Sequence, residues 1–282
     1  MESSLYNPRL EPQAPQPAPP QEKRRPPWRR LLGWLGAGAL LAFKFAAKLK
    51  GLLLLLPKIK ILSTSGTMLV SVAAYALIWG WRFALGFVLL LFVHEMGHVI
   101  QLRREGIPAS APMFIPFIGA FVAMKEMPKD AAAEARVGLA GPVLGSVACL
   151  VPLAIYWAGA SELFLALAYV GFLLNLFNLL PVLPLDGGRA MAALSPALWF
   201  VGYALLIAAT IVFPNPVLIL VLLLGGLETW RRWKIRKTPE AREYHRVPRR
   251  TRAIVAGVYL GLALGLAVGV DLTFVERDFG DV

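Results

Sequence analysis

Long apolar runs separated by short polar connections are the feature that most limits what this chain can fold into. A helix needs roughly 20 apolar residues to cross a hydrocarbon core about 30 Å thick, and several runs approach that length. Hydrophobic residues make up 57% of the 282 residues and charged residues 16%, so a bilayer is the expected environment. The pattern predicts an all-α polytopic membrane protein with about six to seven transmembrane helices. The runs are 63–81, 83–100, 137–157, 163–180, 197–213, 216–230 and 253–270.

The segments outside this series differ in composition. Residues 1–30 are rich in proline and basic residues and have no apolar period, which predicts a disordered cytosolic tail. In 31–62 an apolar segment carries Lys44 and Lys48 on one helical face, which favours an amphipathic helix in the membrane interface and leaves a short spanning helix as the alternative. We expect an intramembrane core at 63–230, a basic cytosolic loop at 231–252, and a C-terminal transmembrane helix with a short acidic tail at 253–282.

The positive charge of the chain lies between the apolar runs. The formal net charge is +12. In a soluble protein this would suggest a nucleic-acid partner, but cations beside membrane helices usually mark the cytosolic side. If the N-terminus is cytosolic and the runs alternate, every Lys and Arg except Arg82 and Arg277 falls on that side. The pattern predicts a multi-pass protein of a bacterial inner membrane, with the bilayer and not nucleic acid as its partner.

Three ionisable residues interrupt the second run, in "LLLFVHEMGHVIQLRREG". In a helix, His94 and His98 are four residues apart and point the same way, so both imidazoles can bind one metal ion. Glu95 lies about 100° round the helix, close enough to reach a metal-bound water. H-E-x-x-H is the zinc-protease arrangement. Burying these groups in a membrane without use would cost several kcal/mol, which argues against a chance occurrence.

A catalytic zinc site needs a third protein ligand and leaves its fourth position for water. Asp186, in "FNLLPVLPLDGGRAM", is the best candidate. Two prolines end the preceding run, and Gly187 and Gly188 are expected to allow a sharp turn. Arginines follow His98 and Asp186 at short distance, which places both near the same membrane boundary. The alternative is an ordinary loop carboxylate in a D-G-G turn.

Together, "HEMGH" and the later "NLLPVLPLDGG" resemble the site-2 protease family of intramembrane zinc metalloproteases, over roughly residues 64–196. The resemblance implies hydrolysis of a peptide bond in or near the transmembrane segment of a membrane-protein substrate, close to the cytosolic face. Asn178 matches the family's asparagine that steadies the substrate or its oxyanion. An interhelical hydrogen bond is the alternative role of Asn178, and Asn175 is a less favoured substitute. The resemblance implies one Zn²⁺ ligated by His94, His98 and Asp186, with Glu95 as general base.

Two further segments fit this pattern. Residues 111–128, "APMFIPFIGAFVAMKEMP", are apolar but broken by prolines and a glycine, which predicts a re-entrant hairpin or strand beside the site. Its edge around 120–124 is expected to hold unwound substrate by β-augmentation, with a plug or packing hairpin as the alternative. "LAGPVLGS", 139–146, resembles the glycine-proline kink of the family's third helix, with Gly145 where an asparagine is often found.

A second class of function stays open, namely a polytopic metal transporter or a catalytically inactive relative that binds membrane helices. A transporter is expected to carry ionisable residues along several helices as a relay. Here those residues gather at one depth, and Glu95, which a pure binder does not need, is intact. The sequence therefore favours the protease, without indicating its substrate, regulatory partner or oligomeric state.

Overall fold

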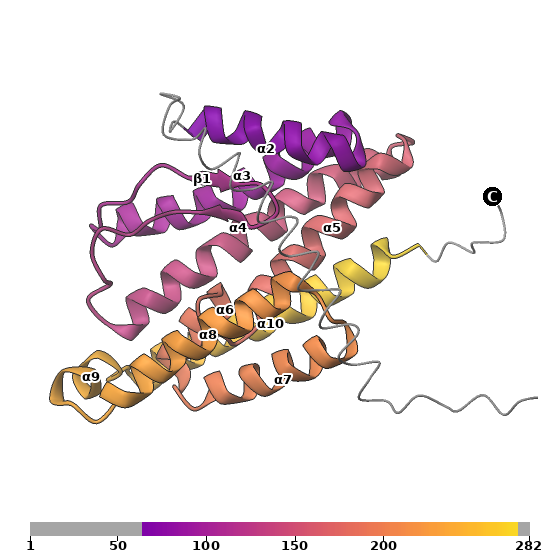
Figure 1. Ribbon diagram of the computed structural model, residues 1–282. Coiled ribbons are helices and arrows are strands. Elements are labelled where there is room, and N and C mark those ends of the chain that lie inside the picture. The colour runs from indigo at the N-terminus through magenta and orange to yellow at the C-terminus, as the bar shows by residue number, and fades with distance from the viewer. Residues whose placement is uncertain (1–63, 276–282) are drawn as a thin grey trace, which may run out of the picture. The chain divides into compact units, whose positions relative to one another are not determined.

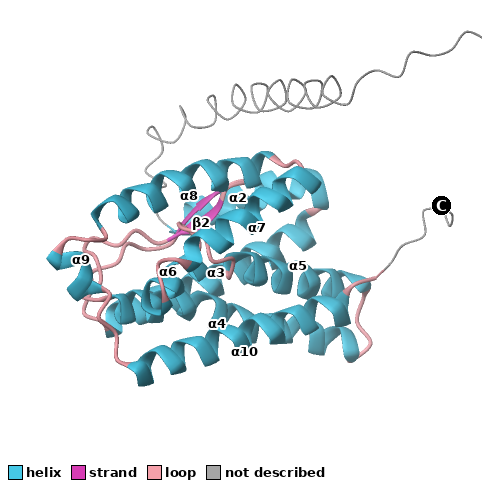
Figure 2. Cartoon of the chain, turned by 90° about the horizontal axis from the view of Figure 1, so that it is seen from below, coloured by secondary structure: helices cyan, strands magenta, loops and turns pink. Residues whose placement is uncertain are grey.

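The computed structural model describes residues 64–275 (Figures 1 and 2). The expectations for the tail at 1–30, for the segment at 31–62 and for the acidic end of the chain lie outside these residues. The described part is mostly helical, with one short hairpin. In chain order its elements are α2 (Thr64–Trp79), α3 (Trp81–Arg104), β1 (Met113–Ile115), β2 (Gly119–Phe121), α4 (Ala131–Trp157), α5 (Glu162–Asn178), α6 (Asp186–Leu194), α7 (Leu198–Val212), α8 (Pro216–Ile235), α9 (Pro239–Tyr244) and α10 (Arg249–Thr273).

Each of the seven apolar runs within 63–270 coincides with a helix. Among the described residues, three helices (α3, α4 and α10) are long and apolar enough to cross a membrane, while α2, α5 and α7 are shorter apolar helices. The outer faces of these helices are apolar: Ile211 on α7 and Leu264 on α10 are 75% and 68% exposed. Such surfaces are rare on soluble proteins, so the chain is an integral membrane protein. The number of six to seven spans stays a prediction.

Helix α4 is the element against which the others pack. It contacts α3, α5, α6 and α10, and Figure 2 shows it running beside α10. The helix begins where the Asp130 side chain accepts a hydrogen bond from the Ala133 amide (2.7 Å), which satisfies one of the free N–H groups of a helix start. Pro142 lies inside it, as the sequence predicted. The neighbours of α4 approach at its glycines, where a methyl group would meet their atoms.

The segment 111–128 forms an antiparallel hairpin, in which β1 and β2 pair. It is fixed to α2 by two hydrogen bonds. The Phe114 amide donates to Thr67 Oγ1 (3.3 Å), and the Phe117 amide donates to the Tyr75 hydroxyl (3.1 Å). The predicted hairpin is therefore present, and its re-entrant position in a membrane stays a prediction.

A buried ion pair ties the basic connection 231–252 to the start of α4. Glu134 is 1% exposed and accepts hydrogen bonds from Arg232 on α8 (3.0 Å) and from the Tyr244 hydroxyl on α9 (2.7 Å). Burial and the Glu134 charge raise the pKa of Tyr244 well above its usual value, so the phenol stays protonated and donates. Arg232 also bonds Glu228 and lies over the Trp199 ring. The connection thus contains ordered structure, in α9 and the ends of α8 and α10.

The Glu134 cluster yields a stability prediction. Glu134→Ala leaves the partly buried Arg232 and Tyr244 without their shared acceptor, and breaking a buried pair from one side typically costs about 3 kcal/mol. We expect a clear fall in the thermal midpoint of the full chain in detergent. Glu243→Ala is the control, because Glu243 and Arg246 form an ion pair that is 75% and 80% exposed and such pairs contribute little. Equal midpoints for the two variants would contradict the assigned role of Glu134.

Candidate metal centre

The structure brings together the three side chains that the sequence predicted as ligands. His94 and His98 lie one turn apart on α3, and both are buried. Asp186 is the first residue of α6, 92 positions after His94. Asp186 Oδ2 lies 3.1 Å from His94 Nε2 and 3.3 Å from His98 Nε2, and the two Nε2 atoms are 3.2 Å apart. Three potential ligand atoms therefore form a nearly equilateral triangle.

Hydrogen bonds on the far side of each imidazole orient these atoms. His94 Nδ1 lies 2.8 Å from the Asn175 side-chain oxygen, and His98 Nδ1 lies 2.8 Å from the Val137 carbonyl oxygen. Both oxygens are acceptors, since the Asn175 amide nitrogen donates to the Gly171 carbonyl (2.8 Å). Each Nδ1 must therefore carry the proton, which leaves a lone pair on each Nε2 facing the triangle.

The triangle has the size that a tetrahedral zinc ion requires. Nitrogen and oxygen ligands lie about 2.0–2.1 Å from zinc, so two ligands of one tetrahedral ion are about 3.3 Å apart. Two lone pairs and a carboxylate oxygen at 3.1–3.3 Å repel one another unless a cation lies between them. The donor set, two imidazoles and one carboxylate, also leaves a fourth position open. The residues present therefore fit the metal that the sequence predicts.

Glu95 lies next to this triangle and is not one of the three candidate ligands. Its side chain is 6% exposed and close enough to His94, His98 and Asp186 to interact with their charges. Within residues 64–275 its carboxylate makes no hydrogen bond and no ion pair at contact distance. A buried carboxylate without a structural partner beside a metal site is suited to accept a proton from a bound water.

Asp186 is held by backbone packing around α6. The sharp turn predicted at Gly187 and Gly188 is wrong, because both residues lie in the first turn of α6. A methyl group on Gly187 would meet the Leu179 carbonyl, and one on Gly188 would meet the Val182 backbone. The glycines thus allow the preceding segment to pass directly against the helix. Trp199 Nε1 then donates to the Gly188 carbonyl at 2.7 Å.

The two candidate asparagines on α5 have different surroundings. Asn175 is 3% exposed and contacts His94, and Gly145 on α4 provides the space for it, since a methyl group there would meet its amide. Asn178 is the last residue of α5, is partly exposed, and makes no side-chain hydrogen bond within the described part of the chain. The contact between Asn175 and His94 was not predicted from the sequence. Asn178 stays a prediction as a group for substrate.

Comparison with known proteins agrees with this geometry. The sequence profile described as Peptidase family M50 matches residues 82–160 and 152–209, which include α3 except Trp81, α4 to α6 and all three candidate ligands. The chain is 30% identical over 129 residues to the zinc metalloprotease MJ0392 of Methanocaldococcus jannaschii, covering 44% of this chain and 37% of that protein. It is 37% identical over 111 residues to Rip3 of Mycobacterium tuberculosis, covering 36% of this chain and 28% of Rip3.

The matched region is the membrane core that carries the candidate metal centre. Residues 82–209 of this integral membrane protein are therefore similar to peptidase family M50. The chain spans little more than a third of the length of the first of these relatives and less than a third of the second.

The ligand assignment predicts the metal content of the purified chain. We expect about one zinc ion per chain. Asp186→Ala and His98→Ala should each lower the zinc content measured by mass spectrometry after dialysis, because a three-ligand site loses much of its affinity with one ligand. Full zinc retention by Asp186→Ala would remove Asp186 from the site.

The two asparagines allow a matched comparison. Asn175→Ala removes the acceptor that orients His94, and loss of such a partner typically lowers metal affinity by about 10–100-fold. Asn178→Ala should leave zinc affinity unchanged, since Asn178 does not contact a ligand. Competition with a chelator measures both affinities. If the two variants lose zinc equally, the bond between Asn175 and His94 does not set the imidazole orientation.

Proposed function

We propose that this protein is an intramembrane zinc metalloprotease that hydrolyses a peptide bond in or near the transmembrane segment of a membrane protein, close to the cytosolic face. The main evidence is the site itself. Ligand atoms of His94, His98 and Asp186 lie 3.1–3.3 Å from one another, and Glu95, which makes no hydrogen bond among the described residues, lies beside them. The match of residues 82–209 to Peptidase family M50 and the name of the Methanocaldococcus jannaschii relative support the same activity.

Each residue of the site has a distinct role in this proposal. His94 Nε2, His98 Nε2 and Asp186 Oδ2 would hold the zinc, which when bound lowers the pKa of a water toward about 7 and polarises a carbonyl group. Glu95 accepts a proton from the attacking water and then delivers it to the nitrogen of the departing amine, so that one water is consumed for each peptide bond. Asn178 donates its amide hydrogen to the substrate carbonyl.

The hairpin supplies a place for the substrate backbone. In a transmembrane helix the carbonyls are hydrogen-bonded within the helix, so a segment must unwind locally before it can be hydrolysed. Strand β2 pairs with β1 on one side, and no further strand of the described chain pairs with it. An unwound segment can add to its second edge by main-chain hydrogen bonds. Contacts of β2 with α3, which carries the histidines, support this placement.

The proposed orientation places the N-terminus and the basic connection 231–252 in the cytosol of a bacterial cell, since cations concentrate on that side. A cysteine at Ser161 should react with an impermeant thiol reagent added outside cells, and one at Lys237 should react only after lysis. Both positions are exposed, whereas the native Cys149 is buried. The reverse labelling pattern would overturn the orientation.

Glu95→Gln separates the protease from a binder or transporter. The variant keeps the size of the side chain but cannot accept a proton, so hydrolysis should fall by roughly 10²-fold or more while zinc content is unchanged. Wild-type and variant protein are compared in bilayers with a library of single-span substrates, measuring cleavage and co-purification. Full cleavage by the variant would exclude Glu95 as base. If wild-type protein cleaves no substrate and both forms capture substrates equally, the protein is a helix binder.

A further inference from the structure

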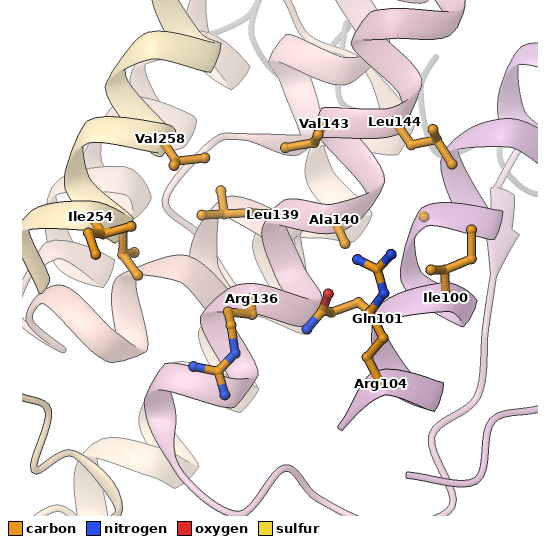
Figure 3. A pocket seen from close by; sticks show the side chains of 12 residues that line it. Ile100, Gln101, Arg104, Arg136, Leu139, Ala140, Val143, Leu144, Ile254 and Val258 are labelled. Carbon is orange, nitrogen blue, oxygen red and sulfur yellow. The ribbon is translucent and has the colours of Figure 1, made fainter. Parts of the chain in front are cut away.

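A groove on the opposite face of α4 is not used by the metal centre. Helix α4 forms its floor, and α3 and α10 form its walls (Figure 3). At 100° per residue, Gly138, Gly141 and Gly145 of α4, which face Asp186, the two histidines and Asn175, lie on one side of the helix. The groove residues Leu139 and Val143 lie on the other side. The cavity measures about 380 Å³, near the lower end of the range for ligand pockets.

The two ends of this groove differ in chemistry. Figure 3 shows Gln101, Arg104 and Arg136 at one end and the aliphatic residues Val143, Leu144 and Val258 at the other. The apolar part borders the membrane-facing surface, where Val143 and Val258 are 41% and 40% exposed. A molecule that fills the groove must therefore combine a long apolar part with a group that suits arginine.

The basic end has positive charge to spare. Glu105 accepts hydrogen bonds from Arg136 Nε (2.6 Å) and Nη2 (3.0 Å) and from the Gln101 amide (2.9 Å), so it neutralises Arg136. Arg104 has no acidic partner among residues 64–275. An arginine at the end of a membrane helix without an acidic partner favours an anion.

The charge and the lipid-facing position of the groove select between the molecules that could enter it. The groove is apolar along its membrane-facing part and ends at an arginine without an acidic partner among the described residues. A membrane lipid offers an acyl chain to the first and a phosphate to the second, whereas an apolar substrate helix offers nothing to the arginine. We propose that the groove binds one anionic phospholipid, with its phosphate at Arg104 and an acyl chain along Leu139, Val143 and Val258. The lipid would join α10 to the α3 and α4 pair.

The test compares two lipids that share their acyl chains and differ in headgroup, one anionic and one zwitterionic. The full chain in dodecyl maltoside is titrated with dioleoyl phosphatidylglycerol or dioleoyl phosphatidylcholine, and bound lipid is counted by native mass spectrometry. We expect wild-type protein to bind the anionic lipid about tenfold more tightly, as a charge-assisted contact provides. Arg104→Gln should remove this preference, and Arg103→Gln, on the same helix turn but outside the groove, should keep it.

A second pair of variants tests the acyl chain. Val258→Trp fills the groove and should lower the affinity for both lipids, while Leu260→Trp, on the same helix but outside the groove, should not. Val143→Trp replaces Val258→Trp if the latter does not fold. Millimolar glycerol phosphate should not displace the lipid, which distinguishes a lipid site from a site for free phosphate.

Four results would overturn the proposal. Equal binding of the two lipids by wild-type protein would remove the charge preference. Equal loss of affinity for the anionic lipid in Arg103→Gln and Arg104→Gln would indicate a diffuse electrostatic attraction of the lipid to the basic ends of the helices. Displacement by glycerol phosphate would indicate a free-phosphate site. Loss of substrate capture by Val258→Trp with unchanged lipid binding would assign the groove to substrate. None of these results depends on whether Glu95 supports hydrolysis.

Discussion

The close approach of the α4 backbone to the two histidines is the contact on which the rest of the core depends. A methyl group on Gly141 would meet the Nε2 atoms of both His94 and His98, so no other residue at this position leaves their ligand faces open. Gly97 on α3 lies in turn against the Ala140 carbonyl. Helices that approach at small residues pack by direct backbone contact, which in a membrane replaces the hydrophobic driving force. The same contact lets the Val137 carbonyl reach His98.

The third ligand depends on elements outside the apolar series. Asp186 lies on a short helix whose Gly188 carbonyl accepts a hydrogen bond from Trp199 on α7. The ring of Trp199 lies against Arg232, which is itself bonded to the buried Glu134. The position of Asp186 therefore rests on a continuous set of contacts from α4 through α8 and α7. This arrangement gives the basic connection a structural role besides its effect on topology.

Local patterns in the sequence were sufficient for the seven apolar helices and for the three candidate ligands. The apolar runs predicted seven helices because the length and hydrophobicity of each run are visible in the sequence. The helix repeat places His94 and His98 on one face. The helix that begins at Asp186 was missed, since its glycines resemble turn residues. The contact between Asn175 and His94 was also missed, because Asn175 and Asn178 share the end of one helix and only the packing of Gly145 distinguishes them. Such proximity between distant segments has no local sequence signal.

The separation of the ligands along the chain has a consequence for the mechanics of the core. His94 and Asp186 are 92 residues apart, so an ion bound to both would act as a removable cross-link across α3, the hairpin, α4, α5 and α6. The entropy of closing a loop grows with the logarithm of its length, and a link across a segment this long restricts many conformations of the unlinked chain. Metal release would remove this link, while the contacts of α6 with Gly138 and Trp199 would still hold Asp186 near the two histidines.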